Sequence, residues 1–253
     1  MTPRQRLLAF LLGGMGLAGL LAWGMAGLPG FGSHRAAYGQ LVTRLSVPLR
    51  NTTDVVTAVN LDFRGFDTIG EEFILFCSIT ATAVLLRRQT REIVGAPRDQ
   101  RPGRRSPGRD DGVLVLGTAL GALVVCFGLY VVGHGQLTPG GGFQGGAILA
   151  GGVALLYLAS GLRAVERAAP EWLLEIGEAV GAGSFVAVGL ASLAAGAAFL
   201  QNLLPLGTPG TITAGGALGL INGAVGLEVA AGTSLVVYLF LVQLLRIEAA
   251  GGG

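Results

Sequence analysis

The stretch His134-Gly-Gln-Leu-Thr-Pro-Gly-Gly-Gly-Phe-Gln-Gly-Gly146 decides the fold, because it joins two long apolar runs. These runs are Val113–Gly133 and Phe143–Leu162, and each is long enough to cross a bilayer as a helix. A link between membrane helices is ordinarily polar, whereas this one holds six glycines and a proline within thirteen residues. Glycine permits positive φ and a close approach of backbones, and proline fixes a turn.

Two interpretations of this link are open. Irregular backbone persists at membrane depth only where it is buried in protein or lines a wet cavity. The first interpretation is therefore a re-entrant or tightly packed element near an ion path, and the second is a plain exposed turn beside a glycine-rich packing face. The residues proposed to pack are Pro139, Gly140, Gly141, Gly142, Gln144, Gly145 and Gly146. Gly140–Gly145 also fits GxGxxG, but a dinucleotide site is excluded because a membrane helix follows and no strand precedes.

The composition is that of an all-α integral membrane protein. The chain has 253 residues, of which 51% are hydrophobic and 13% charged, whereas soluble domains carry about 25% charged residues. About six membrane helices are expected in a glycine-rich bundle. The first run is favoured as a retained helix over a signal peptide, whose apolar core is shorter. The six runs are Leu7–Leu28, Asp67–Leu86, Val113–Gly133, Phe143–Leu162, Pro170–Leu200 and Ile221–Leu245.

The connections divide the chain into three predicted parts. Within the polar segment Pro29–Gly65, the residues Val55–Phe63 predict a short helix that lies on the membrane or packs on the bundle. Residues 88–112 form a flexible arginine-rich linker, and Gln201–Gly219 is a loop. The predicted parts are a two-helix segment (1–87), the linker (88–112) and a four-helix domain (113–253).

Arginine placement predicts the orientation. With six spans both termini share one side, which holds thirteen of the seventeen arginines, while the other side holds four. Positive residues are enriched in cytoplasmic loops. Both termini and the linker are therefore predicted to be cytoplasmic, and the link at His134 faces outward. A topology signal explains the arginine run more simply than nucleic-acid binding, because no aromatic residues interleave it.

Ionisable residues in or beside the apolar runs are candidates for an ion path, since each costs at least about 2.5–3.5 kcal/mol at the centre of a span. The candidates are Glu71, Asp67, Glu228, His134 and Glu178. Structural alternatives stay open for all of them. Glu71 and Glu72 could be an acidic helix N-terminus, Glu228 and Glu178 buried or interfacial structural acids, and His134 a histidine at a helix end. Glu71 and Glu72 point about 100° apart on a helix, so at most one faces a given path.

The sequence offers no catalytic, cofactor or metal signature. Cys77 and Cys126 lie inside apolar runs, without a CxxC pair or a cluster of histidines and cysteines. We find no pairing of a nucleophile with a base, and no phosphate loop. The expectation is therefore that this chain has no cofactor and is not itself an enzyme.

Several motifs resemble the Mrp-type multisubunit cation/proton antiporters. The stretches Leu129–Gly146, Phe199-Leu-Gln-Asn202 and Asn222–Gly232 resemble the B subunit of these complexes, also called MnhB or MrpB. Val56–Glu71 is similar to the small E subunit of membrane-bound hydrogenases and to the C-terminal end of the large A subunit of the antiporters. The chain thus resembles a fusion of two small subunits. Glu71 matches the acid of the GFDTxGE motif, whereas Glu72 falls where an apolar residue is expected.

This resemblance implies a multi-pass subunit of a bacterial or archaeal cell membrane, working in sodium or other cation/proton exchange with further membrane subunits. The large antiporter-like subunits carry buried lysines, and this chain has no lysine, so it is not one of them. The alternatives are a subunit of a hydrogenase-like, redox-driven complex related to respiratory complex I, and a scaffold with no ion path of its own.

Overall fold

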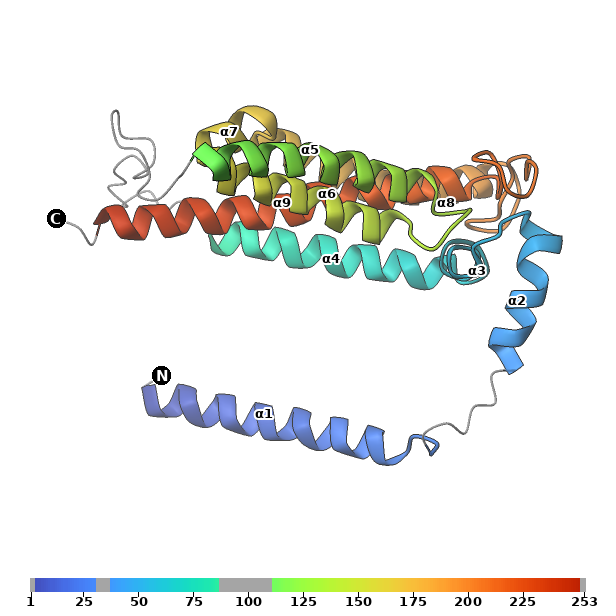
Figure 1. Cartoon of the computed structure of the whole chain (residues 1–253). Coiled ribbons are helices and arrows are strands. Elements are labelled where there is room, and N and C mark those ends of the chain that lie inside the picture. The colour runs from blue at the N-terminus through green and yellow to red at the C-terminus, as the bar shows by residue number, and fades with distance from the viewer. Residues whose placement is uncertain (1–2, 31–36, 87–110, 251–253) are drawn as a thin grey trace. The chain divides into compact units, whose positions relative to one another are not determined.

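The computed structural model describes residues 3–30, 37–86 and 111–250, which are helical or irregular and contain no strand (Figure 1). The arginine-rich linker lies almost entirely outside the described residues. The chain divides into two compact units, residues 1–41 and residues 42–253. Six helices among the described residues are long and apolar enough to cross a membrane. This confirms the predicted all-α membrane fold.

The first unit contains helix α1 (Pro3–Ala26) and the beginning of α2 (Ala37–Arg50). The membrane-length part of α1, Leu7–Ala26, agrees with the first predicted span. Helix α2 was not predicted, because it lies in the mixed, polar segment Pro29–Gly65 and contains Pro48. Its C-terminal half belongs to the second unit, where Val42 and Ser46 are buried.

The second unit is a bundle arranged around its last helix. Helix α9 (Leu218–Ala250) contacts α4, α5, α6 and α8, and 56% of its membrane-length part is buried, against at most 33% for any of these neighbours. A helix so enclosed meets protein rather than lipid on most sides. The surrounding helices are α4 (Gly65–Leu85), α5 (Asp111–Gly133), α6 (Gly142–Ser160) and α8 (Glu171–Ala194).

Some boundaries differ from the predicted ones where glycine adopts positive φ. Helix α6 ends at Ser160 rather than Leu162, because Gly161 takes φ 82° and a short helix, α7 (Leu162–Ala168), starts after it. Helix α8 begins after Pro170 as expected but ends at Ala194, because Gly196 takes φ 78° within the following turn. The loop before α9 therefore begins after Ala194, earlier than the predicted start at Gln201.

The predicted short helix at Val55–Phe63 is present and packs on the bundle. It consists of α3 (Val55–Ala58), capped by the Asp54 side chain, followed by the π-helical segment η1 (Val59–Phe63). Segment η1 contacts α4 and α9, and its Leu61 is buried. The sequence left open whether this helix lies on the membrane or packs on the bundle, and the structure shows it packed on the bundle.

Two apolar clusters form the core of this unit. The first lies toward the beginning of α9 and includes Leu61, Phe185, Val225 and Val229. The second lies toward the end of the α9 span and includes Ile79, Leu174, Leu235, Tyr238 and Val242. Along α9, residues 226–234 separate most of the first cluster from the second.

Candidate functional site

The link between α5 and α6 is held on one side by a row of threonines. Thr57 Oγ1 donates to the carbonyl of Gly135 at 2.6 Å, and Thr53 Oγ1 donates to the carbonyl of Leu137 at 2.6 Å. Thr52 donates to the carbonyl of Gln136, and both residues are buried. The segment that begins α3 therefore supplies donors to carbonyls that no helix satisfies.

The same link is held on its other side by α9 and the loop before it. Gln136 Nε2 donates to the carbonyl of Ile212 at 2.6 Å, and the backbone N–H of Gly142 donates to Asn222 Oδ1 at 3.0 Å. Gly140 and Gly141 have φ of 157° and 125°. The link is thus a tightly packed element, in which Pro139 and Gln144 are exposed members. Its relation to an ion path stays a prediction.

The glycines of α6 let two helices approach at once. A Cβ on Gly142 would stand 2.6 Å from the Asn222 carbonyl oxygen, and one on Gly146 would stand 2.9 Å from the Gly226 carbonyl oxygen, both on α9. A Cβ on Gly145 would stand 2.8 Å from the Gly128 carbonyl oxygen on α5. These separations are closer than Cβ atoms tolerate, so only glycine fits the three positions.

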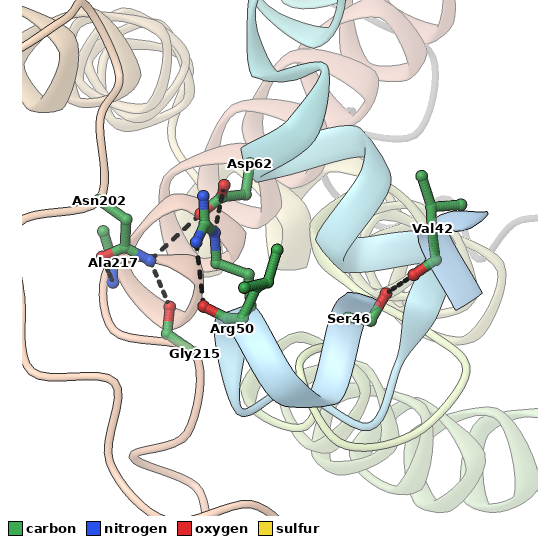
Figure 2. A network of polar contacts seen from close by, with 8 residues as sticks. Val42, Ser46, Arg50, Asp62, Asn202, Gly215 and Ala217 are labelled. Atoms are coloured by element: carbon green, nitrogen blue, oxygen red, sulfur yellow. Dashed lines mark hydrogen bonds and ion pairs between the residues drawn. The ribbon is translucent and has the colours of Figure 1, made fainter. Parts of the chain in front are cut away.

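A polar network joins two of the motifs singled out in the sequence (Figure 2). Arg50 Nε donates to Asp62 Oδ1 at 2.6 Å, and Asn202 Nδ2 donates to Asp62 Oδ2 at 3.3 Å. Asn202 also donates to the carbonyl of Gly215 at 2.8 Å and accepts from the N–H of Ala217 at 3.0 Å. The network ties α2 and η1 to the loop before α9, a structural role for these motifs.

Three of the predicted ion-path residues lie at the surface of this unit. Asp67 is exposed and forms an ion pair with Arg64 one turn away. His134 stacks on Tyr130 with ring centroids 4.0 Å apart, and its Nδ1 lies 3.1 Å from the Tyr130 carbonyl oxygen. Glu71 is exposed. None of the three is brought together with the other predicted acids, and their roles stay predictions.

Three glutamates of the described residues are buried: Glu72, Glu178 and Glu228, with exposed fractions of 1%, 5% and 0%. Glu72 and Glu228 are side-chain neighbours, and Glu178 interacts electrostatically with Glu228. The three carboxylates, from α4, α8 and α9, thus form one group between the two apolar clusters. We call Glu72, Glu178 and Glu228 the acid layer.

Glycine on α8 allows the acid layer to form. A Cβ on Gly181 would stand 2.5 Å from the backbone nitrogen of Glu228, so α8 and α9 touch at their backbones there. Gly177, one turn earlier, lies against Ala231. Gly232 on α9 in turn faces the side chain of Glu178, whose Cγ would be 3.5 Å from an added Cβ. The GxxxG pair beside Glu178 therefore sets the distance between these helices.

Five of the six carboxylate oxygens of the acid layer lack a hydrogen-bond partner among the described residues. Both oxygens of Glu72, both of Glu228 and Oε1 of Glu178 are buried and unpartnered. The ion pairs of Arg50 with Asp62 and of Arg64 with Asp67 do not involve these glutamates. Because buried carboxylates are expensive unless paired, the acid layer costs the bundle stability.

Sequence reasoning weighed Glu72 beside Glu71 as a cation or proton site but preferred Glu71, because Glu72 departs from the motif. In the folded bundle Glu72 lies on the same face of α4 as small and polar residues, and the neighbouring helix is what reveals this face as the inward one. The buried residues of that helix are Gly65, Thr68, Glu72 and Ile79, which follow a helical period, whereas Phe66 and Ile74 are exposed. The inward face of α4 is thus its small and polar face.

A cavity of about 760 Å³ opens beside the acid layer, between the end of α4, the start of α8 and the later part of α9. Glu171, Glu175 and Glu178 line it from α8, and Tyr238 lines it from α9. The three glutamates have the spacing i, i+4, i+7, which places them on one face of α8. Glu171 and Glu175 are exposed, so acidic side chains lead from the surface to the buried Glu178.

Comparisons with known proteins place this arrangement in a family. Residues 113–235 match the model of a domain related to the MnhB subunit of Na+/H+ antiporter. An uncharacterized protein of Methanocaldococcus jannaschii is 30% identical over 215 residues, which are 76% of this chain and 79% of the relative. This chain belongs to the MnhB-related family. The resemblance to B subunits predicted from the sequence is thereby confirmed.

Further relatives of this MnhB-related chain are parts of larger assemblies. A protein of Rhizobium meliloti, named as the probable A/B subunit of a K+/H+ antiporter, is 33% identical over 129 residues, 45% of this chain but 13% of that protein. A chain of the membrane-bound sulfane sulfur reductase, an archaeal respiratory membrane complex, has a TM-score of 0.67 and 31% identity, covering 94% of this chain and 98% of that one.

The fold also recurs in the Mrp complex from Dietzia sp., with a TM-score of 0.65 and 24% identity, over 94% of this chain and 26% of that one. The MnhB-related chain therefore spans about a quarter of that Mrp chain. The family match contains the glycine link, Glu178 and Glu228, whereas Glu72 precedes it. The acid layer thus joins the MnhB-related part to the segment before it.

Proposed function

We propose that this chain is a membrane subunit of an Mrp-type cation/proton antiporter complex, in which it takes part in ion translocation and assembly. The observation that carries the proposal is the MnhB-related match over the helices that contain the packed glycine link. The likeness of fold to a chain of an Mrp complex supports it. A multi-pass transporter component of this kind works with other membrane subunits.

The outer surface of the bundle supports a place within a larger membrane assembly. On α4, Phe66, Ile74 and Leu85 are 73%, 70% and 84% exposed. Such residues face lipid or the apolar helices of partner subunits. Glu71 lies on this outer side of α4, so it would belong to an ion path only where another subunit covers it. The proposed orientation has both termini and the linker in the cytoplasm, as the arginine distribution predicts.

A second candidate is a subunit of a redox-driven membrane complex. The observation that favours it is the 31% identity to a chain of the sulfane sulfur reductase complex, nearly all of which this chain covers. In that case the same bundle would couple ion movement to an electron-transfer module carried by other subunits. The two candidates differ in their partners and not in the chain itself.

Purifying the tagged full chain from its native membranes tests both candidates. Co-purification of antiporter-like membrane subunits, without stoichiometric iron or nickel, is the expected result. Iron–sulfur or nickel-containing partners would favour the redox-driven complex instead. A chain that purifies by itself from gently solubilised native membranes would contradict both.

A further inference from the structure

We infer that Glu178, Glu228 and Glu72 form a proton relay inside this chain, entered from the cavity between α4, α8 and α9. The inference rests on the proposed function only in that a transporter complex would use such a relay. It names the transported species at this site, and it joins Glu72 to the two sequence candidates Glu178 and Glu228 in one relay, which neither the family match nor the sequence assigns.

Within the acid layer, the three neighbouring acids lie at successive depths of the bundle. A helix rises about 1.5 Å per residue, so Glu178 lies about 10 Å from the start of α8. Glu72 likewise lies about 10 Å from the start of α4, which is at the opposite end of the bundle. Glu228 is about 15 Å from the start of α9, between them. The chain runs in opposite directions in α8 and α4, so the order across the bundle is Glu178, Glu228, Glu72.

Access from one side of the bundle is open and acidic. The cavity reaches Glu178 and is lined at its mouth by Glu171 and Glu175, of which Glu175 interacts electrostatically with Glu178. Carboxylates on one helix face can pass a proton along, either directly or through water between them. The first apolar cluster, which includes Phe185, Val225 and Val229, packs on the other side of Glu228.

A proton bound to one carboxyl of the acid layer would supply a hydrogen bond that the unprotonated acids lack. Glu72 and Glu228 are neighbours, yet none of their four oxygens has a donor. A proton on either carboxyl makes a donor to the other and halves the charge of the pair. Transfer then needs only that the O–H bond on one carboxyl breaks as the O–H bond on the next one forms, with no other reactant.

A dehydrated metal cation fits the acid layer less well than a proton. Such ions need several oxygen ligands converging on one point. Among the described residues no group of three or more histidine, cysteine or acidic side chains is arranged to hold a metal ion. The acids meet in pairs, Glu178 with Glu228 and Glu228 with Glu72, which suits a species that moves between two oxygens at a time.

Carbodiimide labelling tests the relay without any transport activity. Dicyclohexylcarbodiimide adds to a protonated carboxyl in apolar surroundings, and the adduct rearranges to a stable N-acylurea that mass spectrometry detects. In native membranes containing the full chain, we expect labelling of Glu178, which borders the cavity, and loss of that label in Glu178→Gln. Asp111→Asn, an exposed acid at the start of α5, is the control and should leave the label unchanged.

Labelling also separates a proton from a cation. If Glu178 remains unlabelled in well-folded chain, the relay is overturned. Protection of Glu178 by sodium at constant pH would overturn the proton assignment in favour of a cation site. Labelling that is lost as pH rises, and is indifferent to sodium, supports the relay.

Transport by the assembled complex is the second measurement. Glu228→Gln keeps the volume of the side chain but cannot ionise, so we expect proton uptake into vesicles to fall at least about tenfold while the complex stays assembled, since each relay step needs an ionisable oxygen. Glu228→Asp should retain part of the rate, and Glu72→Gln should behave like Glu228→Gln. Undiminished proton uptake by an assembled Glu228→Gln complex would overturn the relay.

The antiporter function and the proton relay can be disproved independently of each other. A labelled Glu178 in a chain whose partners carry iron–sulfur clusters would keep the relay and reject the antiporter. An antiporter complex that is fully active with Glu72, Glu178 and Glu228 each changed to glutamine would keep the proposed function and reject the relay. If the buried Glu228 variant fails to assemble, Glu178→Gln, at the half-open cavity, provides the same test.

Discussion

Replacing Gly146 by alanine should weaken the bundle, whereas the same change at Gly151 should not. Both glycines lie inside α6. A Cβ at position 146 would stand 2.7 Å from Val229 Cβ, 2.9 Å from the Gly226 carbonyl oxygen and 3.0 Å from the Ala230 nitrogen. A Cβ at position 151 would meet nothing within 4 Å. Gly151→Ala is therefore a matched control on the same helix.

The size of the difference follows from two opposing effects. Alanine is favoured over glycine in a helix interior by about 1 kcal/mol, and both variants share this gain, so it cancels when they are compared. Overfilling a packed contact costs about 1–3 kcal/mol, and only the Gly146 variant bears this cost. The obstacles there are backbone atoms and a β-branched Cβ, which no change of rotamer removes. The two variants should therefore differ in unfolding free energy by about 1–3 kcal/mol.

Thermal unfolding of the detergent-solubilised full chain measures this gap. For a chain of about this size 1 kcal/mol shifts Tm by about 2–4 °C, so the Gly146→Ala variant should melt at least about 2 °C below the Gly151→Ala variant. Equal melting temperatures for the two variants would show that α6 and α9 do not touch at Gly146, and the close packing described for α6 would be wrong.

Three further predictions address the link, the motif acid and the orientation. Asn222→Ala removes the acceptor of the buried Gly142 N–H and should cost about 1–3 kcal/mol of stability, whereas Asn222→Asp keeps an acceptor; equal Tm values for Ala and wild type would contradict the hydrogen bond. Glu71→Gln should abolish cation-dependent proton exchange in an assembled complex, and Glu71→Asp should retain part of that exchange. Full exchange by the Glu71→Gln variant would show that Glu71 is not on the ion path and would leave the buried acids as the candidates. Single cysteines at Arg98–Arg109, in a chain without its native cysteines, should resist an impermeant thiol reagent on intact cells; strong labelling would reverse the orientation.

The membrane helices could be predicted from the sequence because their apolar runs have the length of a bilayer. The link between α5 and α6 could also be singled out, since glycine and proline gather there without an ordinary turn pattern. Its partners could not, because Thr57 of α3 and Asn222 of α9 are each separated from it by about 80 residues. Contacts at such distances along the chain leave no periodic pattern to detect.

The choice between Glu71 and Glu72 shows where sequence reasoning ends. Both are acids in the same turn of α4, and the motif resemblance points to the first. Burial of the second follows from its place on the face of Thr68 and Ile79, and that face can be chosen only when the neighbouring helix is known. In a membrane bundle, apolar side chains line the outside as readily as the inside, so hydrophobicity does not identify the inward face.

The glycines of α8 and the acid layer depend on one another. Because Gly181 has no side chain, α8 approaches the backbone of Glu228 directly, and little room remains there for lipid or water. The same close approach places Glu178, one turn before Gly181, opposite the turn of α9 that follows Glu228, against Gly232. Glu178 is thus buried although it borders the cavity, and it interacts electrostatically with Glu228 and Glu175. It therefore has a carboxylate of another helix as its charged neighbour, and this is the condition under which a proton, rather than an ion pair, must balance the charge.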